Sequence, residues 1–195
     1  SCDVYFYGVA DRMGIDHLHE FLAKFGLGAA TGIDISGERK GLVPSREWKK
    51  KAFKKKDLQT WFPGETVIAG IGQGFMLATP LQLAQATATV SMRGRRFAPR
   101  LVTAMRDPVT GEIIKVPPRE LPPVTVNKPE HWDAIIAGMV GVTNDPTGTA
   151  RRSQAGAPYV MAGKTGTAQV FSVGQNERYS DKDIAERLKD HALFI

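Results

Sequence analysis

The chain has 195 residues, 42% hydrophobic and 24% charged, a length and balance that suit a globular protein with one sizeable core. Its net charge of +6 is concentrated in the run KKKAFKKK at 49–56, which is typical of a solvated loop, with contact to a polyanion or an anionic lipid as the alternative. The chain lacks the aromatic and zinc-finger patterns of nucleic-acid-binding domains, so no nucleic acid is expected as a partner.

The first half of the chain predicts helices separated by a long irregular segment. Residues 4–13 and 15–25 are predicted as two consecutive helices, the second ended by Gly26. Residues 27–64 are rich in Gly, Pro and Lys and are expected to be irregular. The glycine-rich GIGQG at 70–74 is expected to form a close-packed turn, because no Lys-Ser/Thr follows it as in a phosphate-binding loop.

The helix that starts after Thr79 has the clearest boundaries. Thr79 can cap it, Pro80 suits its first turn, Gln82 completes a capping box and Gly94 ends it. A hairpin around RDPVTG at 106–111 is expected next, followed by a helix that starts at Pro129.

The last third alternates again, with a strand at 159–171, a charged linker or short helix at 183–190 and a strand at 191–195. Helices mixed with late strands predict an α+β fold with an antiparallel sheet.

The segment GKTGTA at 163–168 places one lysine among small residues. Side chains alternate along a strand, so Lys164 and Gly166 are expected on one face and Thr165 and Thr167 on the other. A glycine beside a lysine leaves open space, two hydroxyls and an ammonium group can bind a carboxylate, and a strand-edge N–H can face an oxyanion. A solvated lysine at the edge of a sheet is the alternative.

The K-T-G pattern accompanies S-x-x-K and S-D-N in β-lactamases and penicillin-binding proteins. Ser1-Cys2-Asp3 matches the second motif: the Ser1 hydroxyl can relay a proton, and Asp3 stands where Asn is commoner. Alternatively, Ser1 or Asp3 only caps the following helix. No serine in the chain is followed three residues later by lysine, so S-x-x-K is absent.

Four longer segments together resemble the transpeptidase domain of the penicillin-binding protein 2 family, class B enzymes of rod-shape elongation. They are TGIDISGERKGLVPSREWK, PGETVIAGIGQGFMLATPLQLAQA, NDPTGTA and GKTGTAQVF. The resemblance implies the β-lactamase/transpeptidase-like fold. Residues 1–195 are then expected to be a partial transpeptidase domain, with the nucleophile segment upstream and a final strand and helix downstream, and to be unstable without the remainder.

Members of this family cross-link peptidoglycan as serine D,D-transpeptidases. The resemblance implies attack on the terminal D-Ala-D-Ala of a stem peptide, an acyl-enzyme and transfer of the acyl group to an amine, with β-lactams as inhibitors. By likeness, Ser1 shuttles a proton with Asp3 as its partner, and Lys164 and Thr165 bind the substrate carboxylate. Gly166 would keep the cleft open, and Thr167 would supply an oxyanion N–H and a further hydroxyl.

The resemblance also predicts a metal ligand, partners and a cellular location. Cys2 becomes a candidate zinc ligand with upstream partners, the alternative being a packed thiol, whereas acylation needs no cofactor. His17 and His19 are expected to be surface residues. Stem peptides and β-lactams, a membrane glycosyltransferase and elongation scaffold proteins are the expected partners. The expected location is the inner membrane with the catalytic domain in the periplasm, although the chain contains no run of 18 apolar residues and no signal peptide.

Two other functions fit the same sequence. One is a serine β-lactamase or β-lactam sensor of the same fold. The other is a non-catalytic transpeptidase-like module that docks partners through the basic loop at 45–64.

Overall fold

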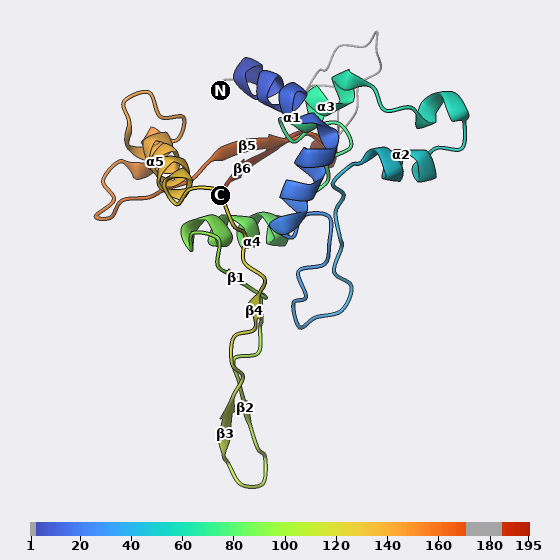
Figure 1. Ribbon diagram of the computed structural model, residues 1–195. Coiled ribbons are helices and arrows are strands. Elements are labelled where there is room, and N and C mark those ends of the chain that lie inside the picture. The colour runs from blue at the N-terminus through green and yellow to red at the C-terminus, as the bar shows by residue number, and fades with distance from the viewer. Residues whose placement is uncertain (1–2, 171–184) are drawn as a thin grey trace. The chain divides into compact units, whose positions relative to one another are not determined.

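The computed structural model describes residues 3–170 and 185–195, which belong to a first unit ending at Asn127 and a second unit from Lys128 to Ile195 (Figure 1). Within these residues, helices accompany three antiparallel pairs of strands, β1–β4, β2–β3 and β5–β6, as the α+β prediction requires. None of the helices in the described part is long and apolar enough to cross a membrane.

The first unit begins with α1, Asp3–Lys24, which is two helices joined at Gly14. Gly14 has φ 73° and ψ 159°, a conformation that glycine adopts readily and that interrupts the helical backbone. Gly26 has φ 87° just beyond the helix. The predicted pair of helices and its glycine stop are therefore confirmed.

The expectation of an irregular segment through 27–64 is wrong beyond Ser45. Helix α2, Arg46–Ala52, starts where the Ser45 hydroxyl accepts a hydrogen bond from the Trp48 N–H (3.0 Å), and the 3₁₀ helix η1, Lys56–Gln59, follows. Helix α3, Pro63–Ala69, has proline in its first turn, and its Glu65 carboxylate accepts from the Phe62 N–H (2.8 Å). Helices α2 and α3 each span less than two turns, so their hydrophobic periodicity is too short to be recognised among the surrounding lysines and glycines.

The basic run is not simply a solvated loop, because Lys49 points inward from α2. Only 3% of Lys49 is exposed, and its ammonium group donates to the Thr60 carbonyl (2.6 Å) and forms an ion pair with Glu65. Four aromatic rings surround the same ammonium at 4.9 to 5.9 Å from their centroids: Phe53, Trp61, Phe62 and Phe75. Cation–π attraction and the carboxylate thus compensate for the lost hydration of the charge.

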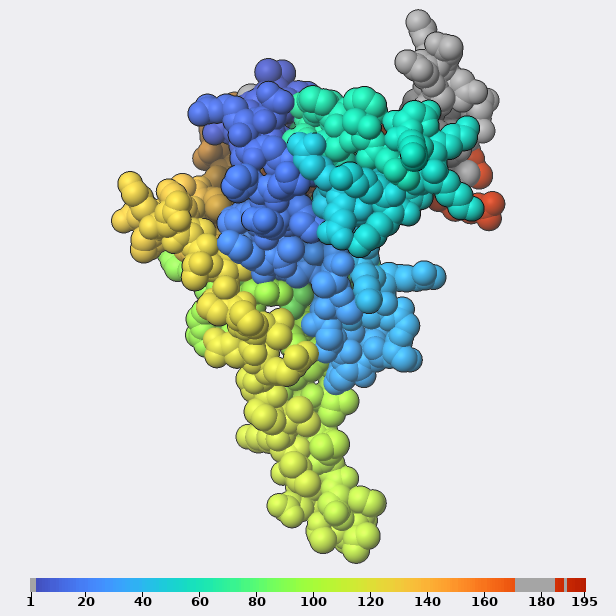
Figure 2. Space-filling view, turned by 45° about the vertical axis from the view of Figure 1, so that its right-hand side comes forward, coloured from blue at the N-terminus to red at the C-terminus, as the bar shows by residue number. Residues whose placement is uncertain are grey.

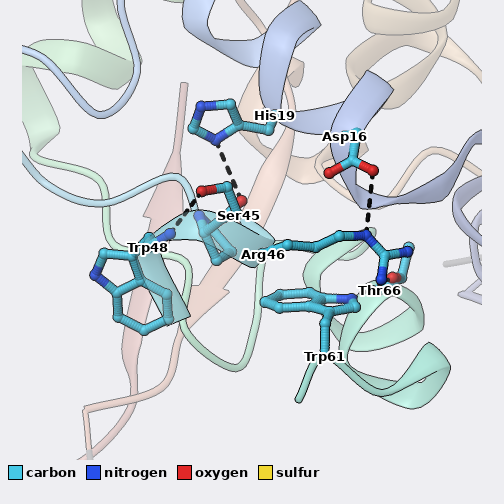
Figure 3. A network of polar contacts seen from close by, with 8 residues as sticks. Asp16, His19, Ser45, Arg46, Trp48, Trp61 and Thr66 are labelled. Carbon is cyan, nitrogen blue, oxygen red and sulfur yellow. Dashed lines mark hydrogen bonds and ion pairs between the residues drawn. The ribbon is translucent and has the colours of Figure 1, made fainter. Parts of the chain in front are cut away.

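Polar contacts join α1 to the start of α2, and a further hydrogen bond ties Trp61 to α3 (Figure 3). Asp16 of α1 accepts from Arg46 Nε (3.1 Å), and the Arg46 side chain extends above the Trp61 indole in the figure. The buried indole N–H of Trp61 donates to the Thr66 hydroxyl (2.8 Å). His19 Nδ1 lies 3.2 Å from the Pro44 carbonyl, so this half-buried histidine is not the surface residue that was predicted, whereas His17 is exposed.

The GIGQG segment forms the expected close-packed turn after α3. Gly70 lies against α1 so closely that a Cβ added to it would stand 2.2 Å from the Ala10 Cβ. Ala10 is itself buried, with 3% of its surface exposed. The pair of small residues therefore sets the distance between α1 and α3.

Helix α4, Pro80–Ser91, follows the predicted capping box of Thr79 and Gln82. The Gln82 side chain, 1% exposed, also donates to the carbonyls of Ala29 and Lys40 (2.7 Å each). One amide group therefore both caps α4 and fixes two points of the irregular segment before α2.

The predicted hairpin forms, as two short ladders in one ribbon. The outer ladder pairs β2, Ala104–Arg106, with β3, Ile113–Lys115, and the inner pairs β1, Arg96–Phe97, with β4, Glu120–Leu121. In Figure 2 the outer part, yellow-green, projects from the rest of the first unit. Asp34 fixes its base by accepting from the Leu101 and Val102 N–H groups (2.7 and 2.9 Å), and these bonds lower the pKa of Asp34.

The second unit contains α5, Glu130–Asn144, a short α6, Arg151–Gln154, and strands β5, Thr165–Ala168, and β6, His191–Phe194, with the 3₁₀ helix η2, Glu186–Leu188. The helix predicted at Pro129 and the strand at 191–195 are confirmed. The strand predicted at 159–171 is shorter, because the Met161 carbonyl and the Gly163 N–H form hydrogen bonds with α5 instead of with another strand. Phe171 lies outside the described residues, as do the first two positions of the predicted linker at 183–190.

Replacing Lys49 with Met tests the buried charge. Removal of one partner leaves the Glu65 carboxylate without its counterion, and we expect the free energy of unfolding to fall by about 3 kcal/mol. The double variant K49M/E65Q should recover part of the loss, and the exposed neighbour in K50M should change stability by less than about 0.5 kcal/mol. Urea unfolding measures all three, and equal losses in K49M and K50M would contradict the role of the pair.

Replacing Gly70 with Ala tests the contact between α1 and α3. Gly70 has ordinary helical dihedrals, so the effect is steric, and we expect a loss of about 1 to 3 kcal/mol from overpacking against Ala10. Adding A10G to G70A should restore part of that loss, giving a favourable coupling energy in a double-mutant cycle of thermal or urea unfolding. Strictly additive effects would show that the two residues do not touch.

Candidate active site

The K-T-G segment lies on β5, which is antiparallel to β6. Lys164 and Ile195 exchange both backbone hydrogen bonds (2.7 and 3.1 Å), and the register continues with Thr165 opposite Phe194 and Thr167 opposite Ala192. In an antiparallel ladder hydrogen-bonded and non-hydrogen-bonded pairs alternate, so the N–H groups of Thr165 and Thr167 point away from β6. That edge of β5 carries no further strand within the described residues.

The ammonium group of Lys164 lies at this open edge. It donates to the Thr165 carbonyl (2.6 Å), which points to the same side as the Thr165 N–H, and it reaches the Thr165 hydroxyl at 3.3 Å. The same edge therefore presents the Lys164 ammonium, the Thr165 hydroxyl and the Thr167 N–H. This arrangement can bind a carboxylate and can donate to an oxyanion.

Gly166 and Gly163 have different surroundings, although only three residues separate them. A Cβ on Gly166 would meet just the Leu193 Cβ at 3.9 Å, an ordinary contact, so packing of the described residues does not require glycine there. A Cβ on Gly163 would stand 2.4 Å from the Phe194 ring and 2.6 Å from the Ile195 carbonyl. Gly163 is needed by the sheet, and Gly166 leaves space above it.

Helix α5 holds the approach to β5. The Thr143 hydroxyl, fully buried, donates to the Met161 carbonyl (2.6 Å), and Asn144 Nδ2 donates to the same oxygen (3.0 Å). The Gly163 N–H donates to the Met139 carbonyl (3.0 Å). The segment that leads to Lys164 is therefore fixed on one helix by three hydrogen bonds.

One residue of this edge was not predicted. The Thr149 hydroxyl lies 3.1 Å from the Thr165 hydroxyl, and Thr149 also lines an open hollow of about 660 Å³, together with Pro146, Gly148, residues 150–153 and Ala155. Thr149 belongs to NDPTGTA, one of the four segments of the resemblance, but sixteen positions separate it from Thr165 and no local pattern links them.

The second predicted motif is described only in part. Ser1 and Cys2 lie outside the described residues, so the shuttle and the zinc ligand stay predictions. Asp3 is in the first turn of α1, where a carboxylate also stabilises the helix. Asp3 belongs to the first unit and Lys164 to the second, and each unit is described by itself. No group of three His, Cys, Asp or Glu side chains in the described residues could hold a metal ion.

The two glycines give a test of which one serves packing. We expect G163A to lower the melting temperature by several degrees, since its methyl group must displace Phe194 and the Ile195 carbonyl, whereas G166A should melt within about a degree of the parent protein. Thermal unfolding followed by circular dichroism measures both. A large loss in G166A would assign that glycine to the sheet rather than to the open space.

Comparison with known proteins identifies the family of the chain. The model of the penicillin binding protein transpeptidase domain matches residues 1–194. The peptidoglycan D,D-transpeptidase MrdA of Escherichia coli K12 is 45% identical over 194 residues, which cover 100% of this chain and 30% of that protein. The chain thus spans less than a third of this curated relative.

Two solved structures share the fold over nearly the whole chain. Pseudomonas aeruginosa PBP2, solved with WCK 5153, is 41% identical with a TM-score of 0.76, and the match covers 98% of this chain and 38% of that one. Helicobacter pylori PBP2, solved with MreC, is 32% identical with a TM-score of 0.75, over 98% of this chain and 31% of that one. The predicted fold is confirmed, and the chain belongs to the penicillin-binding protein transpeptidase domain family.

Proposed function

We propose that the chain is the carboxylate-binding part of a peptidoglycan D,D-transpeptidase, an enzyme that cross-links stem peptides through a serine acyl-enzyme during cell elongation. The observation that carries the proposal is the open edge of β5, where Lys164, the Thr165 hydroxyl and the Thr167 N–H face the same side. The likeness to MrdA and PBP2 supports the reaction and its place in cell elongation.

In the proposed reaction a serine attacks the carbonyl between the two terminal D-Ala residues. The C–N bond breaks, the leaving amine takes a proton, and the acyl group then passes to the amine of a neighbouring peptide. Lys164 and Thr165 bind the terminal carboxylate, Gly166 leaves room for the peptide, and the Thr167 N–H faces the oxyanion. A single such donor stabilises a transition state by about 3 to 4 kcal/mol.

The proton path and the nucleophile complete the proposal. Ser1 relays the proton to the leaving amine with Asp3 as its partner. The chain contains no S-x-x-K sequence, so we assign the nucleophile and its lysine to upstream sequence of the same polypeptide. A Cys2 zinc site, with ligands from that upstream sequence, belongs to the same proposal and would have a structural role.

The relatives suggest the surroundings of the enzyme. The Helicobacter pylori relative was solved in a complex with MreC, and we propose a scaffold protein of this kind as a partner, together with a membrane glycosyltransferase. The expected location is the inner membrane, with this domain in the periplasm.

Labelling with a fluorescent penicillin tests the function. We expect no labelling of residues 1–195 alone and labelling of the complete polypeptide at a serine upstream of Ser1, located by mass spectrometry. K164A should lower the labelling rate of the complete polypeptide at least tenfold, since a charge-assisted bond to the β-lactam carboxylate is lost.

The same experiment separates the alternatives. A transpeptidase keeps the adduct for many minutes, whereas a β-lactamase releases it quickly. A non-catalytic module never forms an adduct. Labelling of residues 1–195 alone would show that the nucleophile assignment is wrong.

A further inference from the structure

We propose that Thr149 is a positioning residue: its hydroxyl donates to Thr165 and turns the Thr165 O–H toward the carboxylate of the substrate. The inference rests on the proposed function, because it concerns the carboxylate that a D,D-transpeptidase binds. It adds to Lys164 and Thr165 a residue from a different segment of the chain.

The hydrogen-bonding capacity of the Thr165 hydroxyl carries the argument. A hydroxyl has one proton to donate and two lone pairs that accept. Lys164 Nζ lies 3.3 Å from the Thr165 oxygen and can only donate to it, and the Thr149 oxygen lies 3.1 Å away and can donate or accept. When Thr149 donates, both lone pairs of Thr165 are used and its own proton is free for an incoming carboxylate.

A bound carboxylate disfavours the opposite direction of this hydrogen bond, in which Thr165 donates to Thr149. If Thr165 donated to Thr149, it would present no proton to the ligand, and an anionic oxygen would face its lone pairs. Two donors aimed at the same oxygen also polarise the Thr165 O–H and make it a stronger donor. Binding of a carboxylate thus selects the direction in which Thr149 is the donor.

The backbone around Thr149 is held firmly enough for this role. The Gly148 N–H donates to the Asp145 carbonyl and the Ala150 N–H to the Val142 carbonyl (2.9 Å each), so the turn closes on the end of α5. A Cβ on Gly148 would stand 2.4 Å from the Val142 carbonyl oxygen, so this glycine lets the turn approach the helix.

The same turn of α5 also fixes the other partner. Thr143 and Asn144 both donate to the Met161 carbonyl, four residues before Thr165. The two hydroxyls are therefore placed by one rigid element, which reaches Thr149 on one side and the start of β5 on the other. Both contacts lie within the second unit.

The experiment compares T149V with T149S in the complete polypeptide, using stopped-flow acylation by penicillin G. Valine keeps the shape of threonine but has no hydroxyl, so we expect the second-order acylation constant to fall by about two- to tenfold, the usual effect of one neutral hydrogen bond. The fall should come from weaker binding, with the acylation step itself unchanged. T149S keeps the hydroxyl and should react like the parent protein.

A penicillin without the carboxylate charge distinguishes positioning from a structural role. The methyl ester of penicillin G should react more slowly with every variant. T149V should lower the rate of the ester no further, because the ester has no anionic carboxylate to accept a charge-assisted hydrogen bond from the Thr165 O–H. T147V is the matched control: Thr147 is an exposed threonine two residues away in the same turn, and its loss should change neither rate.

Each outcome decides the matter. Equal slowing of penicillin G and its ester by T149V, or failure of T149S to restore the rate, would overturn the positioning role and indicate a structural one. Normal acylation of T149V would overturn it while leaving the proposed function intact. No acylation of the parent protein would overturn both.

Discussion

The buried ion pair of Lys49 and Glu65 is the interaction on which the helical part of the first unit depends. It joins α2 to α3, while the Thr60 carbonyl and four aromatic rings complete the surroundings of the ammonium. A charge that is 3% exposed is tolerated only when each lost water contact is replaced, so α2, η1 and α3 must take this one arrangement. Gly70 and Ala10 then bring α3 onto α1.

The second unit depends in a similar way on the last turn of α5. Carbonyl groups at the end of a helix have no partner within it. Here the Val142 carbonyl accepts from the N–H of Ala150, while the side chains of Thr143 and Asn144 donate to the Met161 carbonyl, in the segment that precedes β5. Groups that would otherwise need water thus connect NDPTGTA and GKTGTA, two segments of the family resemblance. The candidate site is rigid because both of the chain segments that form it are attached to the same helix.

Elements with strong local signals could be predicted, and those with weak ones could not. The break at Gly14, the capping box of Thr79 and Gln82 and the start of α5 at Pro129 follow from the conformations that these residues favour. Helices α2 and α3 were not predicted, because each has seven residues and is stabilised mainly by contacts with distant residues. The inward direction of Lys49 could not be predicted either, since the sequence shows only a run of lysines.

For the candidate site, the sequence alone named the candidate residues of β5, a lysine, two threonines and a glycine at strand spacing, and the longer segments identified their family. The tertiary structure decided which edge of β5 is open, because this depends on the register with β6. It alone placed Thr149 against Thr165 and separated the packing role of Gly163 from the open space at Gly166. The physical reason is that hydrogen bonds and van der Waals contacts act over a few ångströms in space, whatever the separation of their partners along the chain.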